Sequence, residues 1–523
     1  DKRDPKFDLT KNALKNGPQE LHEHLALFLE SCLIHGYISL ILLTCAIQPL
    51  VKEVNGKLDS SNNYRGIGIG SIIMKITDWV ILIIHDKELT CDPNQFGNET
   101  NSSTTMCSWT VIELVNLFKN SGSSVFACLL DYRKAFDLVN HQKLFSILIN
   151  RKIGLIFIRL LMFIYINQRC YINWNNTRSY SFSVTNGTRQ GSIFSPKGGF
   201  GVYLDPLLQL LRESGYGLKY GLHWYGALAY CDDLILLSTS VAGLQSMVNI
   251  CASHAANNDL LFSTDPDPQK SKTMCIAFNC ENRNELVSVK LNGDDLPWKE
   301  SAKHIGNTLH QDGTMDADIR VKRAAFINTC MNMNNEFCFI KPDQQVKLLY
   351  IYNSHFSGSS SWNFNSDAFN QMISSWNVNL RAIYDLDYGT HRYLLERLTE
   401  GRHAQQIIYK KYVNFLRAIA TNRRRSLVQL LEIVKTTCRS FTGANLRKIL
   451  LDTGVHIDPG QTKGFVLNNY FVYKTPVNQE WRIPLLVSLL RIRDSNWEIH
   501  FDDEAGQLKE DDVSSLLSSV CIG

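Results

Sequence analysis

Apolar residues recur with different periods along this chain. Near its start, several apolar side chains fall three or four positions apart, which predicts one face of a helix in a packed helical lead-in over residues 1–50: Leu21, Leu25, Phe28, Leu29, Cys32 and Leu33. From 48 to 70 the pattern changes to short extended pieces around the turn dipeptide Asn55-Gly56, which predicts a hairpin that carries basic side chains. Residues 107–119 and 141–167 return to helical spacing.

Two apolar, strand-like segments lead to acidic residues. Residues 124–130 form a short apolar run that ends at Asp131, as in a buried strand that delivers a carboxylate at its end. Residues 227–238 are apolar, then acidic at Asp232 and Asp233, then apolar again, which predicts a tight hairpin. Between them, residues 187–196 have loop chemistry before a predicted helix at 204–211. Beyond about 310, long helices with basic residues are predicted.

Composition narrows the class of protein without naming a function. With 523 residues, 44% hydrophobic and 10% aromatic, the chain can bury a large core and should form two to four domains. A net charge of only +4 means that a nucleic-acid surface would need local clusters of Lys and Arg. The 14 cysteines lack zinc-finger spacing, and the apolar stretches 38–50, 72–84 and 153–166 are shorter than the roughly 20 residues of a spanning helix. We therefore expect the cysteines to be reduced thiols in the core and the apolar stretches to be buried segments. The protein is expected to be intracellular, neither secreted nor membrane-spanning. Because the sequence starts at Asp1, we also expect it to be a fragment.

The adjacent pair Asp232 and Asp233 has no Lys or Arg nearby in sequence to neutralise it. Burying an unpaired charge costs several kcal/mol per ion, so a divalent metal is the simplest partner. Mg²⁺ prefers one or two carboxylates completed by phosphate oxygens and water. With Asp131 as a third carboxylate, the pattern fits a two-metal phosphoryl-transfer site. The alternative is a solvated turn that happens to carry two acids.

These segments resemble the successive palm motifs of reverse transcriptases. The motif-like stretches are 131–137, 187–196 and 230–233, in the order and at the spacing of that family. Residues 63–67 resemble the fingers motif of non-LTR elements, and further similar segments are Gln95-Phe96-Gly97, Lys270-Ser271-Lys272 and 303–306. The resemblance covers about 45–310 and weakens beyond, where Ser361-Trp362 and Thr390-His391-Arg392 resemble jockey-like elements.

The resemblance implies an α+β fold of the right-hand polymerase type. Its parts would be a helical lead-in at 1–44, fingers at 45–125, a palm at 126–290, a largely helical thumb at 291–460 and a C-terminal tail at 461–523. It also implies that an N-terminal endonuclease region, which companion elements carry, is missing from this chain. The residues after 460 are too few for a ribonuclease H domain.

The resemblance also implies roles for individual residues. Asp131, Asp232 and Asp233 would be catalytic and hold two Mg²⁺ ions, with Mn²⁺ as an alternative. Phe136 would lie below the incoming sugar and exclude a 2′-hydroxyl, although a core aromatic would look the same in sequence. The remaining candidates for nucleotide binding are Gln190 and Gly191 against the nucleotide and template, Arg65 and Lys52 on the triphosphate, and Lys270 as the acid for pyrophosphate.

The implied function is that of an RNA-directed DNA polymerase of a non-LTR retrotransposon, active in the nucleus and cytoplasm. Its partners would be an RNA template, a DNA primer or RNA–DNA hybrid, and dNTPs. Two alternatives stay open: a decayed copy that only binds nucleic acid, or a related maturase or RNA-copying polymerase. Four positions depart from the family pattern without removing a metal ligand: Gly66, Phe194, Cys231 and Asp267. We expect Phe194 and the unusual Lys197-Gly198-Gly199 to affect the loop that positions the template.

Overall fold

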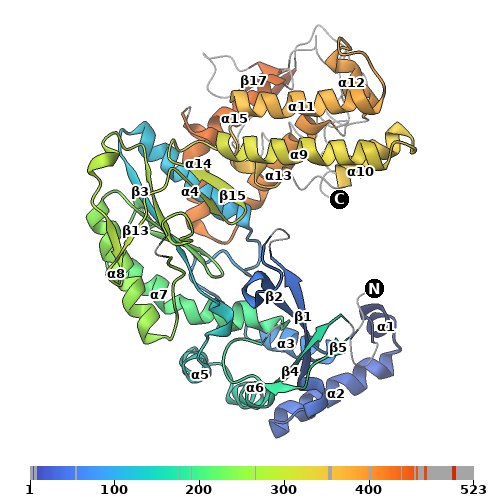
Figure 1. The fold of residues 1–523 in the computed structure, drawn as a ribbon, viewed down its shortest axis with the longest axis vertical. Helices are drawn as coiled ribbons and strands as arrows, with labels where there is room; N and C mark the ends of the chain where they lie inside the picture. Colours follow the sequence, from blue (N-terminus) through green and yellow to red (C-terminus); the bar gives the residue numbers. More distant parts are fainter. Residues whose placement is uncertain are drawn as a thin grey trace. The chain divides into compact units, whose positions relative to one another are not determined.

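The computed structural model describes residue 4 and residues 9–52, 56–175, 177–189, 191–265, 267–351, 356–399, 403–437, 439–452, 455–456, 464–467 and 498–501. The chain divides into two compact units (Figure 1). The first unit contains residues 1–102, 126–275 and 286–298, and the second contains 103–125, 276–285 and 299–523. Each unit is described by itself below. The boundaries of fingers, palm and thumb stay predictions.

The first part of unit 1 is a mixed sheet with helices packed near it. Strand β1 (Thr44–Val51) pairs antiparallel with β2 (Tyr64–Ile69) and parallel with β4 (Arg169–Trp174). The short strands β5 (Thr177–Arg178) and β6 (Phe182–Ser183) both pair with β4. Helix α3 (Ile72–Ile84) follows β2, and α2 (Gln19–His35) packs on α6 (Leu155–Asn167). The β1–β2 pairing confirms the hairpin that the sequence predicts, although Asn55 lies outside the described residues.

The second sheet, most of which belongs to unit 1, carries the acidic residues. Its strand order is β11 (Met274–Phe278), β3 (Val125–Asp131), β10 (Asp233–Ser238) and β9 (Ala227–Tyr230). Every residue of β3 before Asp131 is buried, which explains its unbroken apolar run. The sheet is covered by α7 (Val202–Glu213) and α8 (Val241–Asn257), and α5 (His141–Asn150) packs on α7. A buried apolar strand that ends in a carboxylate is therefore what the structure contains.

Unit 2 is mostly helical. Its helices are α4 (Thr104–Asn120), α9 (Asp316–Glu336), α10 (Pro342–Ile351), α11 (Asp367–Ile383), α12 (Arg392–Leu398), α13 (Ala404–Ala420), α14 (Arg425–Thr436) and α15 (Phe441–Asp452). They are accompanied by the hairpin β14 (Ser301–His304) and β15 (Asn307–His310) and by a three-stranded sheet of β16 (Val455–His456), β17 (Gly464–Leu467) and β18 (Glu498–Phe501). Helix α4 is buried along nearly its whole length and contacts α14 and α15. Its Glu113 is 1% exposed and accepts hydrogen bonds from the backbone N–H and the hydroxyl of Thr442 at 2.8 and 2.7 Å. Burial raises the pKa of Glu113 to about 7.

Some sequence-based expectations need correction. The helical lead-in does not extend to residue 50, because α2 ends at Gly36 in a left-handed cap and β1 begins at Thr44. The apolar stretch 72–84 is not wholly buried: it forms α3, whose Trp79, Ile83 and Ile84 are exposed. The loop at 187–196 is shorter than expected, since a π-helix (Ser195–Gly201) leads directly into α7.

The described residues also test the expectations for membrane-spanning helices and for the cysteines. In the part of the chain that the structure describes, no helix is long and apolar enough to cross a membrane. Among the described residues, twelve cysteines are free thiols and most of them are buried, as the sequence predicts for core cysteines.

Candidate active site

Three aspartates meet at one end of the second sheet. Asp131 is the last residue of β3, Asp233 is the first residue of β10, and the two are directly paired in the antiparallel ladder. Directly opposed residues of an antiparallel pair point to the same face of the sheet, with Cβ atoms about 4.5 to 5.5 Å apart. Asp232 lies beside them in the turn between β9 and β10. The structure therefore brings the three predicted aspartates together from segments far apart in sequence.

The electrostatics of this cluster favour a bound cation. Burial, together with the negative charges of Asp232 and Asp131, raises the pKa of Asp233 to about 6. Burial also raises the pKa of Asp232, with Asp131 as a smaller cause. Positive charge acts in the opposite direction: Arg65 lowers the pKa of both carboxyls. A divalent ion would relieve the repulsion between these carboxylates.

Within the described residues, no three His, Cys, Asp or Glu side chains are placed closely enough to hold a metal by themselves. Mg²⁺ is commonly held by one or two carboxylates together with substrate phosphates and water. Asp131, Asp232 and Asp233 are half-buried, and a metal ion held by them would need such additional ligands.

The basic candidates differ in how they relate to the aspartates. Arg65 is exposed on β2 and is one of the charges that act on Asp232 and Asp233. Lys52 is exposed just after β1, where its backbone N–H donates to Asn63. Lys270 is exposed and forms an ion pair with Asp267 at 3.2 Å. The positive charge of Lys272, by contrast, acts to lower the pKa of Asp233. Lys272 belongs to the Lys270-Ser271-Lys272 segment, of which the sequence analysis proposed only Lys270 as a functional residue.

Phe136 lies in a 3₁₀ turn (Ala135–Asp137) five positions after Asp131. Its ring is half-buried and packs on Phe200 with a centroid separation of 5.0 Å. Its carbonyl accepts a hydrogen bond of 2.6 Å from the backbone N–H of Thr188. This places Phe136 next to the loop at 187–196, where both a nucleotide contact and a packing role are possible for the ring.

The loop at 187–196 is anchored by a buried ion pair. Arg189 donates to both carboxylate oxygens of Asp78 in α3 at 2.5 Å, and both side chains are buried. Asp78 also accepts from the Ser192 hydroxyl at 2.7 Å and from the backbone N–H of Ile193 at 3.0 Å. The sequence reasoning missed Asp78, although a single acid within the apolar stretch 72–84 was a usable signal.

Gly191 lies against the neighbouring strand, whereas Gln190 lies outside the described residues. Gly191 has φ +72°, and a Cβ atom there would lie 2.1 Å from the carbonyl oxygen of Gly68 in β2. Only glycine permits this close backbone approach. The predicted nucleotide-binding residue Gly191 therefore has a packing role in the structure, which neither supports nor contradicts contact with a substrate.

Phe194 and Gly198 are sterically complementary. Phe194 is 1% exposed, and a Cβ atom at position 198 would lie 2.2 Å from a carbon of its ring. Lys197 is buried and forms ion pairs with Asp86 at 3.1 Å and with Glu99 at 3.5 Å. Glycine at 198 thus leaves the space that the phenylalanine ring occupies.

The sheet brings three carboxylates to one end and has helices on its face, as expected of the palm of a right-hand polymerase. Residues 54–309 match the family described as reverse transcriptase (RNA-dependent DNA polymerase). Its relatives are non-LTR retrotransposon polyproteins, which confirms the resemblance found in the sequence. Reverse transcriptases generally use divalent metal ions.

Two curated relatives support this assignment over limited lengths. A retrovirus-related Pol polyprotein from the type-1 retrotransposable element R2 of Nasonia vitripennis is 31% identical over 125 residues, which cover 24% of this chain and 12% of the relative. An uncharacterized 149 kDa protein of transposon TX1 from Xenopus laevis is 32% identical over 137 residues, which cover 25% of this chain and 10% of the relative. The matches thus span about a tenth of each relative's length. Among solved structures, telomerase from Candida tropicalis matches 82% of this chain and 74% of its own, with 10% identity and a TM-score of 0.39.

Proposed function

We propose that this chain catalyses RNA-templated DNA synthesis, in which a primer 3′-hydroxyl attacks the α-phosphate of a dNTP and pyrophosphate leaves. The observation that carries the proposal is the direct pairing of Asp131 with Asp233 beside Asp232, within the region that matches the reverse transcriptase family. The raised pKa of Asp233 supports it, since a carboxylate cluster that repels itself is suited to a cation.

The three aspartates would hold two Mg²⁺ ions, or Mn²⁺ in their place. Such ions lower the pKa of the attacking hydroxyl and stabilise the charge on the leaving group. The protein's contribution is to fix the carboxylates in position: Asp131 and Asp233 are held by the ladder between β3 and β10. The backbone N–H of Asp131 also donates to the hydroxyl of Thr273, at 3.3 Å, which ties the end of β3 to the segment before β11.

Several residues would bind or position the nucleotide next to these aspartates. Arg65 and Lys52 would bind the triphosphate, with stronger support for Arg65 because its charge acts on the aspartates. Phe136 would exclude a ribose 2′-hydroxyl, and Gln190 with Gly191 would contact the base pair. Lys270 is the candidate for protonating pyrophosphate, and Lys272 is a second candidate because its charge acts on Asp233.

The partners would be an RNA template and a DNA primer or RNA–DNA hybrid, within the nucleus and cytoplasm. Exposed cations on the helices of unit 2 and on the segment between α13 and α14 suit the phosphates of such a duplex: Lys410, Arg423 and Arg425. Contacts of this kind are independent of sequence and weaken as salt rises. The shape of an RNA–DNA hybrid can be recognised without reading its bases.

Primer extension tests the proposal. The purified chain is given a DNA primer on an RNA template with dNTPs and Mg²⁺, beside the double variant Asp232→Ala, Asp233→Ala. A matched control is Asp294→Ala, Asp295→Ala, because these exposed adjacent aspartates also lie in a hairpin of unit 1. Extension that is lost only in the first variant is the expected result. Absence of extension by a folded wild-type chain that still binds the hybrid would contradict the proposal and point to a decayed copy.

A further inference from the structure

The turn that carries Asp232 and Asp233 contains a residue in an unfavourable backbone conformation. Cys231 has φ +56°, in the left-handed region. For a residue other than glycine this conformation costs roughly 1 to 2 kcal/mol. Such a conformation persists only where surrounding contacts hold it. The question is therefore which side chain holds Cys231, because the two aspartates that follow depend on its geometry.

Gln95 supplies these contacts. Its Oε1 accepts a hydrogen bond from the backbone N–H of Cys231 at 2.9 Å, and its Nε2 donates to the carbonyl of Cys231 at 3.3 Å. The same Oε1 accepts from the backbone N–H of Gly97 at 2.8 Å. Gln95 is 0% exposed, so these bonds form away from water. The side-chain amide of Gln95 thus forms hydrogen bonds with both the N–H and the carbonyl of the strained residue Cys231.

The segment around Gln95 is joined to the same hairpin by its backbone. The N–H of Phe96 donates to the carbonyl of Ala229 at 2.7 Å, and the N–H of Ala229 donates to the carbonyl of Asn94 at 2.9 Å. Gln95 and Ala229 form an isolated parallel bridge. A Cβ atom at Gly97 would lie 2.3 Å from the backbone nitrogen of Cys231. This close approach leaves the side chain of Gln95 in the position that its hydrogen bonds require.

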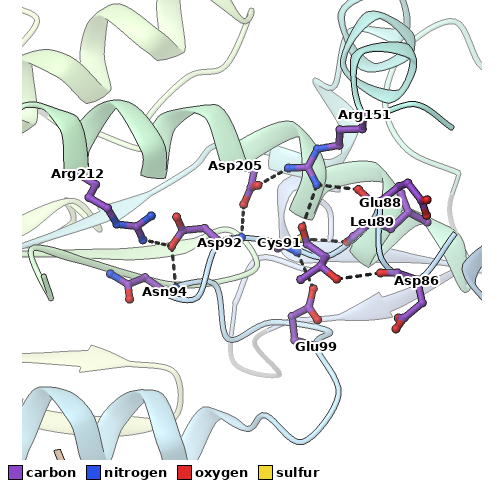
Figure 2. Close-up of polar contacts among 11 residues, drawn as sticks. Asp86, Glu88, Leu89, Cys91, Asp92, Asn94, Glu99, Arg151, Asp205 and Arg212 are labelled. Atoms are coloured by element: carbon purple, nitrogen blue, oxygen red, sulfur yellow. Dashed lines mark hydrogen bonds and ion pairs between the residues drawn. The ribbon is translucent and has the colours of Figure 1, made fainter. Parts of the chain in front are cut away.

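Ion pairs and a hydrogen bond hold the start of the segment that contains Gln95, at Asp92, as Figure 2 shows. Arg212 pairs with Asp92 at 2.5 Å, and Arg151 pairs with Asp205. Asp205 also accepts from the backbone N–H of Asp92 at 2.6 Å. Arg212 and Asp205 both belong to α7, so the loop before Gln95 is attached to a helix that covers the palm sheet. Gln95 therefore projects from a well-anchored support.

We propose that Gln95 is a positioning residue for metal binding: by holding Cys231, it sets the spacing between Asp232, Asp233 and Asp131. The inference rests on the proposed function and deepens it, because it assigns a role in the same site to a residue that contacts none of the reacting atoms. Groups that orient metal ligands from behind typically change metal affinity or activity by about ten- to hundred-fold when they are removed. Gln95 acts on the backbone of the turn and not on a carboxylate.

The test compares Gln95→Met with Gln168→Met. Methionine keeps the length of glutamine and removes its hydrogen bonds. Gln168 is a matched control because it is also buried, at 2% exposed, in the same unit, and its side chain donates to Cys170 instead of the turn. Mn²⁺ binding is measured by electron paramagnetic resonance, without turnover, and thermal unfolding is measured on each protein. Primer extension then gives kcat and KM for dNTP.

We expect Gln95→Met to weaken Mn²⁺ binding about tenfold or more and to lower kcat, with the affinity for the hybrid unchanged. Gln168→Met should leave Mn²⁺ binding as in the wild type. Equal Mn²⁺ affinity in wild type and Gln95→Met would overturn the proposal and leave Gln95 as a packing residue. If Gln95→Met does not fold, Gln95→Asn replaces it: asparagine stays uncharged but is one methylene shorter, so it cannot reach both the N–H and the carbonyl of Cys231. Weaker Mn²⁺ binding is expected, and wild-type Mn²⁺ affinity in this variant would overturn the proposal.

The two proposals fail in different ways. A wild-type chain that binds Mn²⁺ through these aspartates but extends no primer would contradict the polymerase function and leave the role of Gln95 intact. A wild-type chain that extends primers while Gln95→Met binds Mn²⁺ normally would contradict only the role of Gln95.

Discussion

Asp131 and Asp233 are directly paired across β3 and β10, although about a hundred residues of chain separate them. The backbone pairing between β3 and β10 holds the Cα atoms of both residues in place, whichever side chains these residues have. We therefore predict that Asp131→Asn folds as the wild type does and lowers the rate of primer extension by at least about a hundredfold, as expected when a ligand of charge-stabilising ions is lost. Single-turnover extension measures this rate. Asp137→Asn, an exposed acid in the neighbouring turn, serves as the control; equal rates in both variants would contradict a metal-binding role for Asp131.

Phe136 is predicted to select the sugar of the incoming nucleotide. Replacing its ring by the smaller side chain in Phe136→Val should leave room for a 2′-hydroxyl and raise the ratio of rNTP to dNTP incorporation about tenfold or more. Competition between dNTP and rNTP on one RNA template measures the ratio within a single protein preparation. An unchanged ratio would assign Phe136 to packing against Phe200 instead.

Gly191 is predicted to be intolerant of any side chain because of the strand beside it. Gly191→Ala should abolish most extension activity, since the new Cβ would lie 2.1 Å from the carbonyl oxygen of Gly68. Gly215→Ala separates this clash from backbone strain: Gly215 has φ +77°, close to the +72° of Gly191, but nothing lies within 4 Å of its Cβ position. Similar activity in the two variants would show that backbone conformation alone matters at position 191.

The buried pair of Asp78 and Arg189 is predicted to stabilise the loop at 187–196 only as a pair. Asp78→Asn leaves the Arg189 charge buried without its partner, which should lower the free energy of unfolding by about 3 to 5 kcal/mol. Adding Arg189→Gln to Asp78→Asn should recover a substantial part of that loss. Denaturant unfolding of the four proteins of this double-mutant cycle gives the coupling. Losses that simply add would mean that the two side chains act independently.

Glu113 is predicted to make unit 2 less stable as pH rises. Its pKa is about 7 in the folded protein and near 4.5 when exposed, so between these values the folded chain retains a proton that the unfolded chain has lost. Stability therefore falls as pH increases from about 4.5 to 7, by up to about 3 kcal/mol. Thermal unfolding from pH 4.5 to 8, compared with Glu113→Gln, isolates this effect from other titrating groups. Parallel curves for the two proteins would contradict it.

The local parts of the structure were predictable from sequence. The hairpin at 227–238 follows from two apolar runs on either side of two acids, and β3 follows from an apolar run that ends at Asp131, because these patterns depend only on neighbours in the chain. The end of α2 was harder to place, since the apolar spacing continues past Gly36, where the left-handed cap stops the helix.

Contacts between distant segments were not predictable in this way. Gln95 and Cys231 are 136 residues apart, and Asp78 and Arg189 are 111 apart, so no local spacing reveals either pair. Lys272 shows a different difficulty. It lies two positions from Lys270 in the same short motif, and only the folded backbone determines which of the two charges acts on Asp233.

The fit between Phe194 and Gly198 restricts the order in which mutations can accumulate at this site. A phenylalanine ring at 194 leaves no space for a Cβ atom at 198, which would lie 2.2 Å from the ring. In a chain that carried a smaller side chain at 194 and a residue larger than glycine at 198, glycine would have to be acquired before phenylalanine, because the reverse order passes through an overpacked intermediate. Reversion is constrained in the same way: Gly198→Ala should be harmful in this chain and tolerated once Phe194→Leu is present. The two positions are therefore epistatic, and their history can be examined in related copies of the element.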